Sequence, residues 1–232
     1  MRVMVLGDVH GHWADLSDLI KNMQPDIVLQ CGDFGYFPRW VEKGGGRPYD
    51  PTGRMTNRVR FHWCDGNHED HEILAMLREN LDGGKRRAFE IAPNVFWQDR
   101  GSTLTLPDGR VVLFMGGGDS TDKKARKQGR DWFPGELISW ADMRALPDVE
   151  VDIVISHTCP KKFKLQLKNH DKENDPSRQF LDEVLERYKP KLWFFGHWHN
   201  RIQGREGRCS WEGLNKLTPM LKADCFSWLT DR

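Results

Sequence analysis

The sequence predicts an α/β fold built as one domain, with packed β-sheets inside and helices outside. Short apolar runs typical of buried strands recur along the chain, and segments with helical periodicity lie between them. The length of 232 residues fits one large α/β domain. Hydrophobic residues make up 38% of the chain, which is enough for a sizeable core and argues against disorder. We expect the domain to span residues 1–232.

Six apolar runs are too short for helices and rich in Val, Ile, Phe and Trp, which predicts buried strands. They cover residues 2–6, 26–31, 59–64, 111–115, 151–156 and 191–195. Residues 94–115 alternate between apolar and polar side chains and contain the turn sequence Pro-Asp-Gly, which predicts a hairpin. The C-terminal part predicts two further strands, at 208–214 and 225–229.

Three segments place apolar residues at helical spacing, which predicts helices over 13–23, 71–80 and 176–188. The second follows Asp70, which can cap its N-terminus, and the third opens with Pro176. Two long polar segments, 36–58 and 116–135, are predicted loops. Loops of this length in a compact domain are usually functional or disordered.

The overall composition points to neither a nucleic-acid-binding nor a membrane protein. The net charge is +1, from 35 basic and 34 acidic residues. The five cysteines are scattered and form no C-x-x-C pair, which predicts a reduced, cytoplasmic protein without a disulfide framework. The first residues, "MRVMVLGD", are too short for a signal-peptide core, and no run approaches the ~20 apolar residues of a membrane helix.

Side chains of metal-binding types follow five of the six predicted strands. They are Asp8 and His10 after the first run, Asp33 after the second, Asn67 after the third, His157 after the fifth, and His197 and His199 after the sixth. Ligands of α/β sheets bind outside the carboxyl ends of the strands, so we expect these side chains to converge. Each motif alone is weak, because an Asp-x-His often caps a helix and a lone His is usually structural. Their ordered combination predicts a metal site.

The residue types indicate what this site holds. Carboxylates, imidazoles and a carboxamide oxygen suit manganese, iron or zinc. Seven such side chains are too many for one tetrahedral ion, but they suit two ions ~3.5–4 Å apart that share a carboxylate. Such a pair clamps the attacking and leaving oxygens of a displacement at phosphorus and turns a bridging water into hydroxide.

Five short motifs then resemble a known family. "GDVHG" (7–11), "GDFG" (32–35), "GNHE" (66–69), "SH" (156–157) and "GHWH" (196–199) are similar to the signature motifs of the calcineurin-like metallophosphoesterases. The resemblance covers most of the chain. It implies a four-layer αββα sandwich of two packed mixed sheets flanked by helices, with a dinuclear metal site at the strand ends.

The resemblance assigns the seven ligands to two divalent ions: Asp8, His10 and His199 to the first, Asn67, His157 and His197 to the second, and Asp33 to both. Manganese is the leading expectation, with iron, zinc and magnesium as alternatives. His68 would be the general acid that protonates the leaving alkoxide.

Two positions depart from the protein serine/threonine phosphatases of this family. Those phosphatases continue their second motif as "GDxVDRG" and carry an Arg before "GNHE". Here Tyr36 stands where they place the acidic residue that steadies His68, and Asp65 replaces the Arg. The arginines that grip phosphate in that subfamily are therefore expected to be absent. The broader bacterial or phage-type metallophosphoesterases fit better.

The polar loop 116–135 carries five basic residues, Lys123, Lys124, Arg126, Lys127 and Arg130. It is either a solvated charged loop or a lid that binds substrate phosphate, in which case Arg126 and Arg130 are candidate ligands. His12 is a further candidate, or a solvated residue at a helix start. Four tryptophans either belong to the core or line a base-stacking wall: Trp40, Trp132, Trp198 and Trp211.

The leading prediction is a metal-dependent phosphoesterase that hydrolyses phosphomonoesters or phosphodiesters. Alternatives are a nucleotide or nucleic-acid phosphodiesterase, a serine/threonine protein phosphatase, and a binding scaffold of the same fold without chemistry. The low net charge weakens the nuclease version, and the complete set of motifs favours an enzyme over a scaffold. The expected partner is a phosphate-ester substrate, with a nucleotide as one candidate. Nucleic acid stays open, no membrane is expected, and no protein partner can be read from the sequence.

Overall fold

The computed structural model describes residues 1–39, 59–79, 86–167, 174–220 and 223–229, which build two six-stranded sheets. The first sheet runs, from edge to edge, β12 (Phe226–Trp228), β1 (Val3–Leu6), β2 (Ile27–Gln30), β3 (Arg60–Trp63), β5 (Val95–Gln98) and β4 (Ala88–Ala92). The second runs β10 (Ile202–Glu206), β11 (Cys209–Gly213), β9 (Leu192–Phe195), β8 (Ile153–Ser156), β7 (Val111–Met115) and β6 (Thr103–Thr105).

Both sheets are mixed in the same way. The four central strands of each are parallel, and an antiparallel strand lies at each edge. Most of the parallel central strands are buried on both faces and are continuous apolar runs, which explains why the sequence predicted them. β11 is the exception, because its burial alternates along the strand. Because parallel strands point the same way, their carboxyl ends meet along one edge of each sheet.

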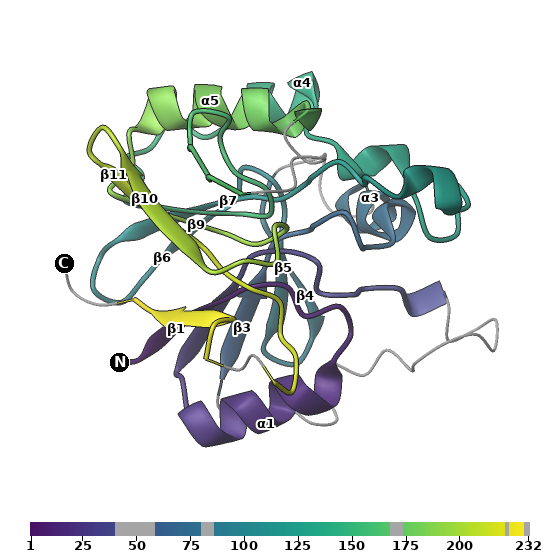
Figure 1. Cartoon of the computed structure of the whole chain (residues 1–232), viewed down its shortest axis with the longest axis horizontal. Coiled ribbons are helices and arrows are strands. Elements are labelled where there is room, and N and C mark those ends of the chain that lie inside the picture. The colour runs from purple at the N-terminus through teal and green to yellow at the C-terminus, as the bar shows by residue number, and fades with distance from the viewer. Residues whose placement is uncertain (40–58, 80–85, 168–173, 221–222, 230–232) are drawn as a thin grey trace.

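Helices cover the outer face of each sheet. They are α1 (Trp13–Met23), α3 (His71–Glu79), α4 (Trp140–Arg144) and α5 (Ser177–Tyr188), with short 3-10 turns η1 (Lys123–Ala125) and η2 (Pro134–Glu136). α1 and α5 lie on opposite outer sides of the molecule (Figure 1). None of the helices within the described part of the chain is long and apolar enough to span a bilayer.

Three layers of buried side chains separate the elements. Alternation along β1 directs Val3 and Val5 between the two sheets and Met4 and Leu6 toward the cluster that contains the buried side of α1. A third cluster joins the second sheet to α5, through residues such as Leu181. The expected four-layer αββα sandwich is thereby confirmed.

The prediction of one hairpin over 94–115 was wrong in part. β5 pairs with β3 and β4 in the first sheet, whereas β6 and β7 form an antiparallel hairpin in the second. The Pro-Asp-Gly turn does connect β6 to β7, and Leu106 donates its N–H to the carbonyl of Arg110 across it, at 2.9 Å. The alternation is common to both sheets, so it could not show that the chain crosses from one sheet to the other.

The tryptophans mostly follow the core alternative. Trp198 and Trp211 are buried in the cluster under α5, which rules out their part in a base-stacking wall. Trp132 is half-buried, and Trp40, like residues 40–58 of the predicted loop 36–58, lies outside the described residues. All five cysteines are buried thiols outside any disulfide, as expected.

Candidate metal centre

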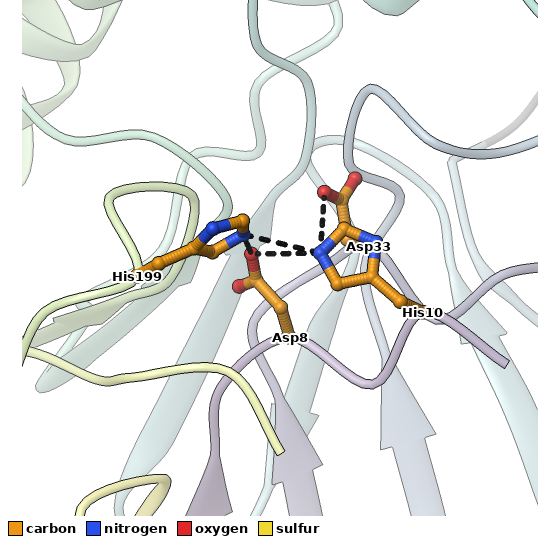
Figure 2. A group of neighbouring side chains, drawn as sticks. All are labelled: Asp8, His10, Asp33 and His199. Atoms are coloured by element: carbon orange, nitrogen blue, oxygen red, sulfur yellow. Dashed lines mark hydrogen bonds and ion pairs between the residues drawn. The ribbon is translucent and has the colours of Figure 1, made fainter. Parts of the chain in front are cut away.

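Five loops bring the predicted ligands together. Three leave the carboxyl ends of β1, β2 and β3 in the first sheet, and two leave β8 and β9 in the second. Figure 2 shows Asp8, His10, Asp33 and His199 facing a common point. One ligand atom from each of these four residues lies within 4.8 Å of all the others.

The first cluster centres on two imidazoles and a buried carboxylate. His199 Nε2 lies 2.9 Å from Asp8 Oδ2 and 3.1 Å from His10 Nε2. His10 Nε2 is in turn 3.5 Å from Asp33 Oδ2. Asp8 is fully buried and Asp33 is 2% exposed. Buried carboxylates need a positive partner, which a divalent cation would supply at this point.

The second cluster lies on the other side of Asp33. His157 Nε2 lies 2.9 Å from Asn67 Oδ1 and 3.0 Å from His197 Nδ1. The same nitrogen is 3.3 Å from Asp33 Oδ1. One oxygen of Asp33 therefore faces each cluster, and each cluster offers four donor atoms. The donor set, imidazole nitrogens with carboxylate and carboxamide oxygens, fits borderline divalent ions such as manganese, iron or zinc.

The backbone of this region is held in an unusual conformation. Four predicted ligands have positive φ although they are not glycine: His10 (49°), Asp33 (53°), His197 (63°) and His199 (51°). A left-handed non-glycine residue costs roughly 1–2 kcal/mol, and such strain concentrates at functional sites. The fold bears this cost where it turns the side chains toward the two clusters.

Two glycines of the motifs leave room for the ligands. A Cβ at Gly196 would lie 1.9 Å from Asp8 Oδ1, and one at Gly66 would lie 2.3 Å from Asp33 Oδ1. Any side chain at either position would push a carboxylate out of place. The glycine of "GNHE" and that of "GHWH" are therefore required by the site, not only by a turn.

Electrostatics keep both carboxylates ionised. Burial opposes ionisation of Asp33, but the neighbouring imidazoles of His157, His68 and His10 outweigh it and lower its pKa to about 2. Burial likewise opposes ionisation of Asp8, and hydrogen bonds from His10 and His199 hold its pKa well below the ordinary value. Two anionic ligands are thus available over the whole neutral pH range.

Other buried groups orient the ligands, and sequence reasoning did not single them out. The carbonyl of Cys31 lies 2.8 Å from His157 Nδ1, which directs Nε2 toward the site. The Glu69 carboxylate accepts the N–H groups of Gly35 (3.0 Å) and Gly66 (2.5 Å) and so ties two motif loops together. Its place in "GNHE" was the available signal.

His68 lies beside the two clusters and contacts an arginine. Its backbone N–H donates to Asp33 Oδ1 at 2.8 Å, and its ring packs edge-on against that of His10, at 4.9 Å between ring centroids. Arg126 Nη2 lies 2.6 Å from His68 Nε2, and because a guanidinium can only donate, this nitrogen accepts. Burial lowers the pKa of His68 to about 4. Tyr36 is buried, and its ring packs against Trp63.

The structure separates the other candidate substrate ligands. Arg126 has a side chain only 9% exposed and pairs with Asp122 at 2.8 Å. Arg130 is 62% exposed and pairs with Asp131 at 2.7 Å. His12 stands at the N-cap of α1 with Nδ1 3.5 Å from Asp15 Oδ2, in keeping with its structural alternative. Of these three residues, Arg126 contacts His68.

Asp65 stands where the phosphatase subfamily has an arginine, and in the folded protein its carboxylate forms a salt bridge with the distant residue Arg100. Arg100 is buried, with Nη2 2.6 Å from Asp65 Oδ2. Its remaining donors reach the carbonyls of Leu137 (2.6 Å) and Gly135 (2.8 Å). Arg100 therefore holds the segment around η2 in place through these hydrogen bonds.

Comparisons with known proteins identify the family of the chain. The profile of the calcineurin-like phosphoesterases matches residues 1–201. The chain therefore belongs to the calcineurin-like phosphoesterase family, a class of phosphoester hydrolases.

Individual relatives are more distant. The lariat debranching enzyme of Schizosaccharomyces pombe is 25% identical over 250 residues, a match that covers 94% of this chain and 52% of that protein. The chain thus spans about half the length of this curated relative. Among solved structures, a novel archaeal phosphodiesterase has a TM-score of 0.45 at 11% identity, with 99% of each chain covered. GAP50, the anchor in the inner membrane complex of Plasmodium, has a TM-score of 0.47 at 11% identity, with 92% of this chain and 70% of that chain covered.

Proposed function

We propose that this protein is a dinuclear metallophosphoesterase that cleaves phosphodiester bonds of nucleotides. The observation that carries the proposal is Asp33, whose two oxygens face two separate donor clusters, at 3.5 Å from His10 and 3.3 Å from His157. Asp8, His10 and His199 would hold one ion, Asn67, His157 and His197 the other, and Asp33 both. Manganese is the first candidate, with iron, zinc and magnesium as alternatives.

When bound, the two ions would supply Lewis-acid activation of water and neutralise charge on the phosphoryl oxygens. The residues of the chain provide the rest. Arg126 would bind a phosphoryl oxygen through a charge-assisted hydrogen bond. His68 would donate the proton that the leaving oxygen needs. In the substrate-free arrangement His68 Nε2 accepts from Arg126, so binding of phosphate by Arg126 would free this nitrogen to carry a proton.

Two lines of reasoning favour a nucleotide diester over the other substrate classes. The Schizosaccharomyces pombe relative, named a lariat debranching enzyme, aligns with 94% of this chain. The departures at Tyr36 and Asp65 weaken the protein phosphatase alternative. Arg100, which pairs with Asp65, does not replace the missing phosphate-binding arginine, because its donors are engaged within the protein. The five cysteines are buried thiols outside any disulfide, which favours a reducing location, so we also propose that the protein is cytoplasmic.

A substrate panel tests the proposal. The protein is stripped with a chelator, reloaded with manganese, and assayed on para-nitrophenyl phosphate, its bis-ester, 2′,5′- and 3′,5′-linked dinucleotides, branched RNA and a phosphopeptide. We expect metal-dependent cleavage of the diesters, and its loss in the Asp33→Asn variant. Preference for the phosphopeptide would instead support a protein phosphatase. Two bound ions without hydrolysis of any substrate would support the binding scaffold.

A further inference from the structure

A buried chain of polar side chains lies behind Asn67. Ser120 Oγ lies 3.1 Å from Asn67 Nδ2, and Glu136 Oε2 lies 2.7 Å from Ser120 Oγ. Asn67 is 5% exposed, Ser120 1%, and Glu136 is fully buried. Ser120 follows β7 and Glu136 ends η2, so neither belongs to a motif.

The hydrogen bonds of Glu136 determine which group donates and which accepts in this series of side chains. Its Oε1 accepts two N–H donors, the backbone amide of Ser120 at 2.8 Å and the indole of Trp132 at 2.9 Å. Burial raises the pKa of Glu136, and the donors from Ser120 and Trp132 counteract that effect. Two N–H donors on one carboxylate stabilise its ionised form, which acts only as an acceptor. The Ser120 hydroxyl must therefore give its proton to Oε2.

The consequence passes to Asn67. With its proton committed to Glu136, the Ser120 oxygen offers lone pairs, and the partner that it accepts from must be the NH₂ group of Asn67. The carboxamide oxygen is then left facing His157 Nε2, 2.9 Å away. This matters because an amide oxygen can bind a metal ion, whereas an amide nitrogen has no lone pair free to do so.

We infer that Ser120 and Glu136 are positioning residues that fix the carboxamide of Asn67 with its oxygen toward the second donor cluster. The inference rests on the proposed function, since it takes Asn67 as a ligand of the second ion. Glu136 also holds the indole of Trp132, so the same carboxylate fixes the loop that carries Arg126.

Glu136→Gln tests the inference with almost no change in shape. Oε1 keeps its two N–H donors, so the new NH₂ group takes the place of Oε2 and donates to Ser120. The Ser120 hydroxyl is then free to donate toward Asn67, which favours the flipped carboxamide. We expect affinity for the second manganese ion to fall about 10- to 100-fold, as for other outer residues that orient metal ligands. The first ion should bind as in the wild type.

Manganese binding is measured by calorimetry and metal content, with thermal unfolding of the metal-free proteins as the folding control. Ser120→Ala removes the hydroxyl but does not reverse the direction of the hydrogen bonds. Its loss of affinity for the second manganese ion should therefore be smaller than that of Glu136→Gln. Trp132→Phe removes the other donor to Glu136 and should leave both ions bound. Asp152→Asn is the matched carboxylate-to-amide control, because Asp152 accepts the Val111 N–H at 3.0 Å at the opposite ends of the strands.

The order in which the three variants lose manganese affinity distinguishes orientation of Asn67 by hydrogen bonds from simple packing. A packing role predicts the largest loss for Trp132→Phe or Ser120→Ala, which remove atoms, and the smallest for Glu136→Gln. That order, or two ions bound with wild-type affinity in Glu136→Gln, would overturn the inference while leaving the metal centre intact. A wild-type protein that does not bind two ions would contradict the proposed centre itself, and the inference with it.

Discussion

Replacing Arg126 with alanine removes a guanidinium whose Nη2 lies 2.6 Å from His68 Nε2. The side chain is only 9% exposed and is held by Asp122, so the group is oriented before substrate arrives. A hydrogen bond to a charged group contributes about 1.5–3 kcal/mol, which corresponds to a fall in kcat/KM of about 10- to 150-fold. Arg126→Lys keeps the charge but loses the planar fork, so its kcat/KM should lie between the two.

The assay is steady-state hydrolysis of a dinucleotide by manganese-loaded protein, with metal content measured on the same sample. Metal content should not change in Arg126→Ala, because no donor atom of either cluster is lost. Arg130→Ala is the control from the same loop. Its side chain is 62% exposed and pairs with Asp131, so its kcat/KM should stay within about fivefold of wild type. Equal losses in both variants, or metal loss in Arg126→Ala, would refute the assignment.

Three further outcomes are expected. Asp33→Asn should lower the occupancy of both ions, measured as metal content, since both share its charge; two ions with wild-type turnover would contradict the bridge. His68→Ala should slow alkyl diesters about 10²- to 10⁴-fold and nitrophenyl esters much less, because nitrophenolate leaves without a proton; equal losses accompanied by metal loss would make His68 a ligand or structural residue. Burial opposes ionisation of Asp142, but Arg100 and other partners lower its pKa to about 2. Because this pKa lies below the ordinary value of 3.8, about 2 kcal/mol of stability is present above pH 4 and lost as pH falls from 4 to 2. Denaturant unfolding at pH 5 and pH 2.5 checks this, and an equal acid loss in Asp142→Asn would show that the group does not contribute.

The sequence by itself determined the central strands, the main helices and the composition of the site. Helix α1 spans the predicted 13–23, α3 covers the predicted 71–79 with residue 80 outside the described residues, and α5 begins one residue after its predicted start. These elements carry their signal locally, as apolar runs or helical spacing. The ligand set could be read for a related reason. Each predicted ligand follows a buried parallel strand, and the carboxyl ends of such strands converge whatever the remaining chain does.

Only the tertiary structure decided which polar groups form hydrogen bonds with the side chains of the site. Edge strands β4 and β10 were missed because their partly exposed residues form no continuous apolar run. Ser120 lies 53 residues from Asn67, and Arg126 lies 58 from His68, within a loop whose basic residues look alike in sequence. A buried polar group must find a partner, but the fold decides which one comes within reach. For that reason the sequence predicted the candidate ligands, and packing between the two sheets decided how their side chains are oriented.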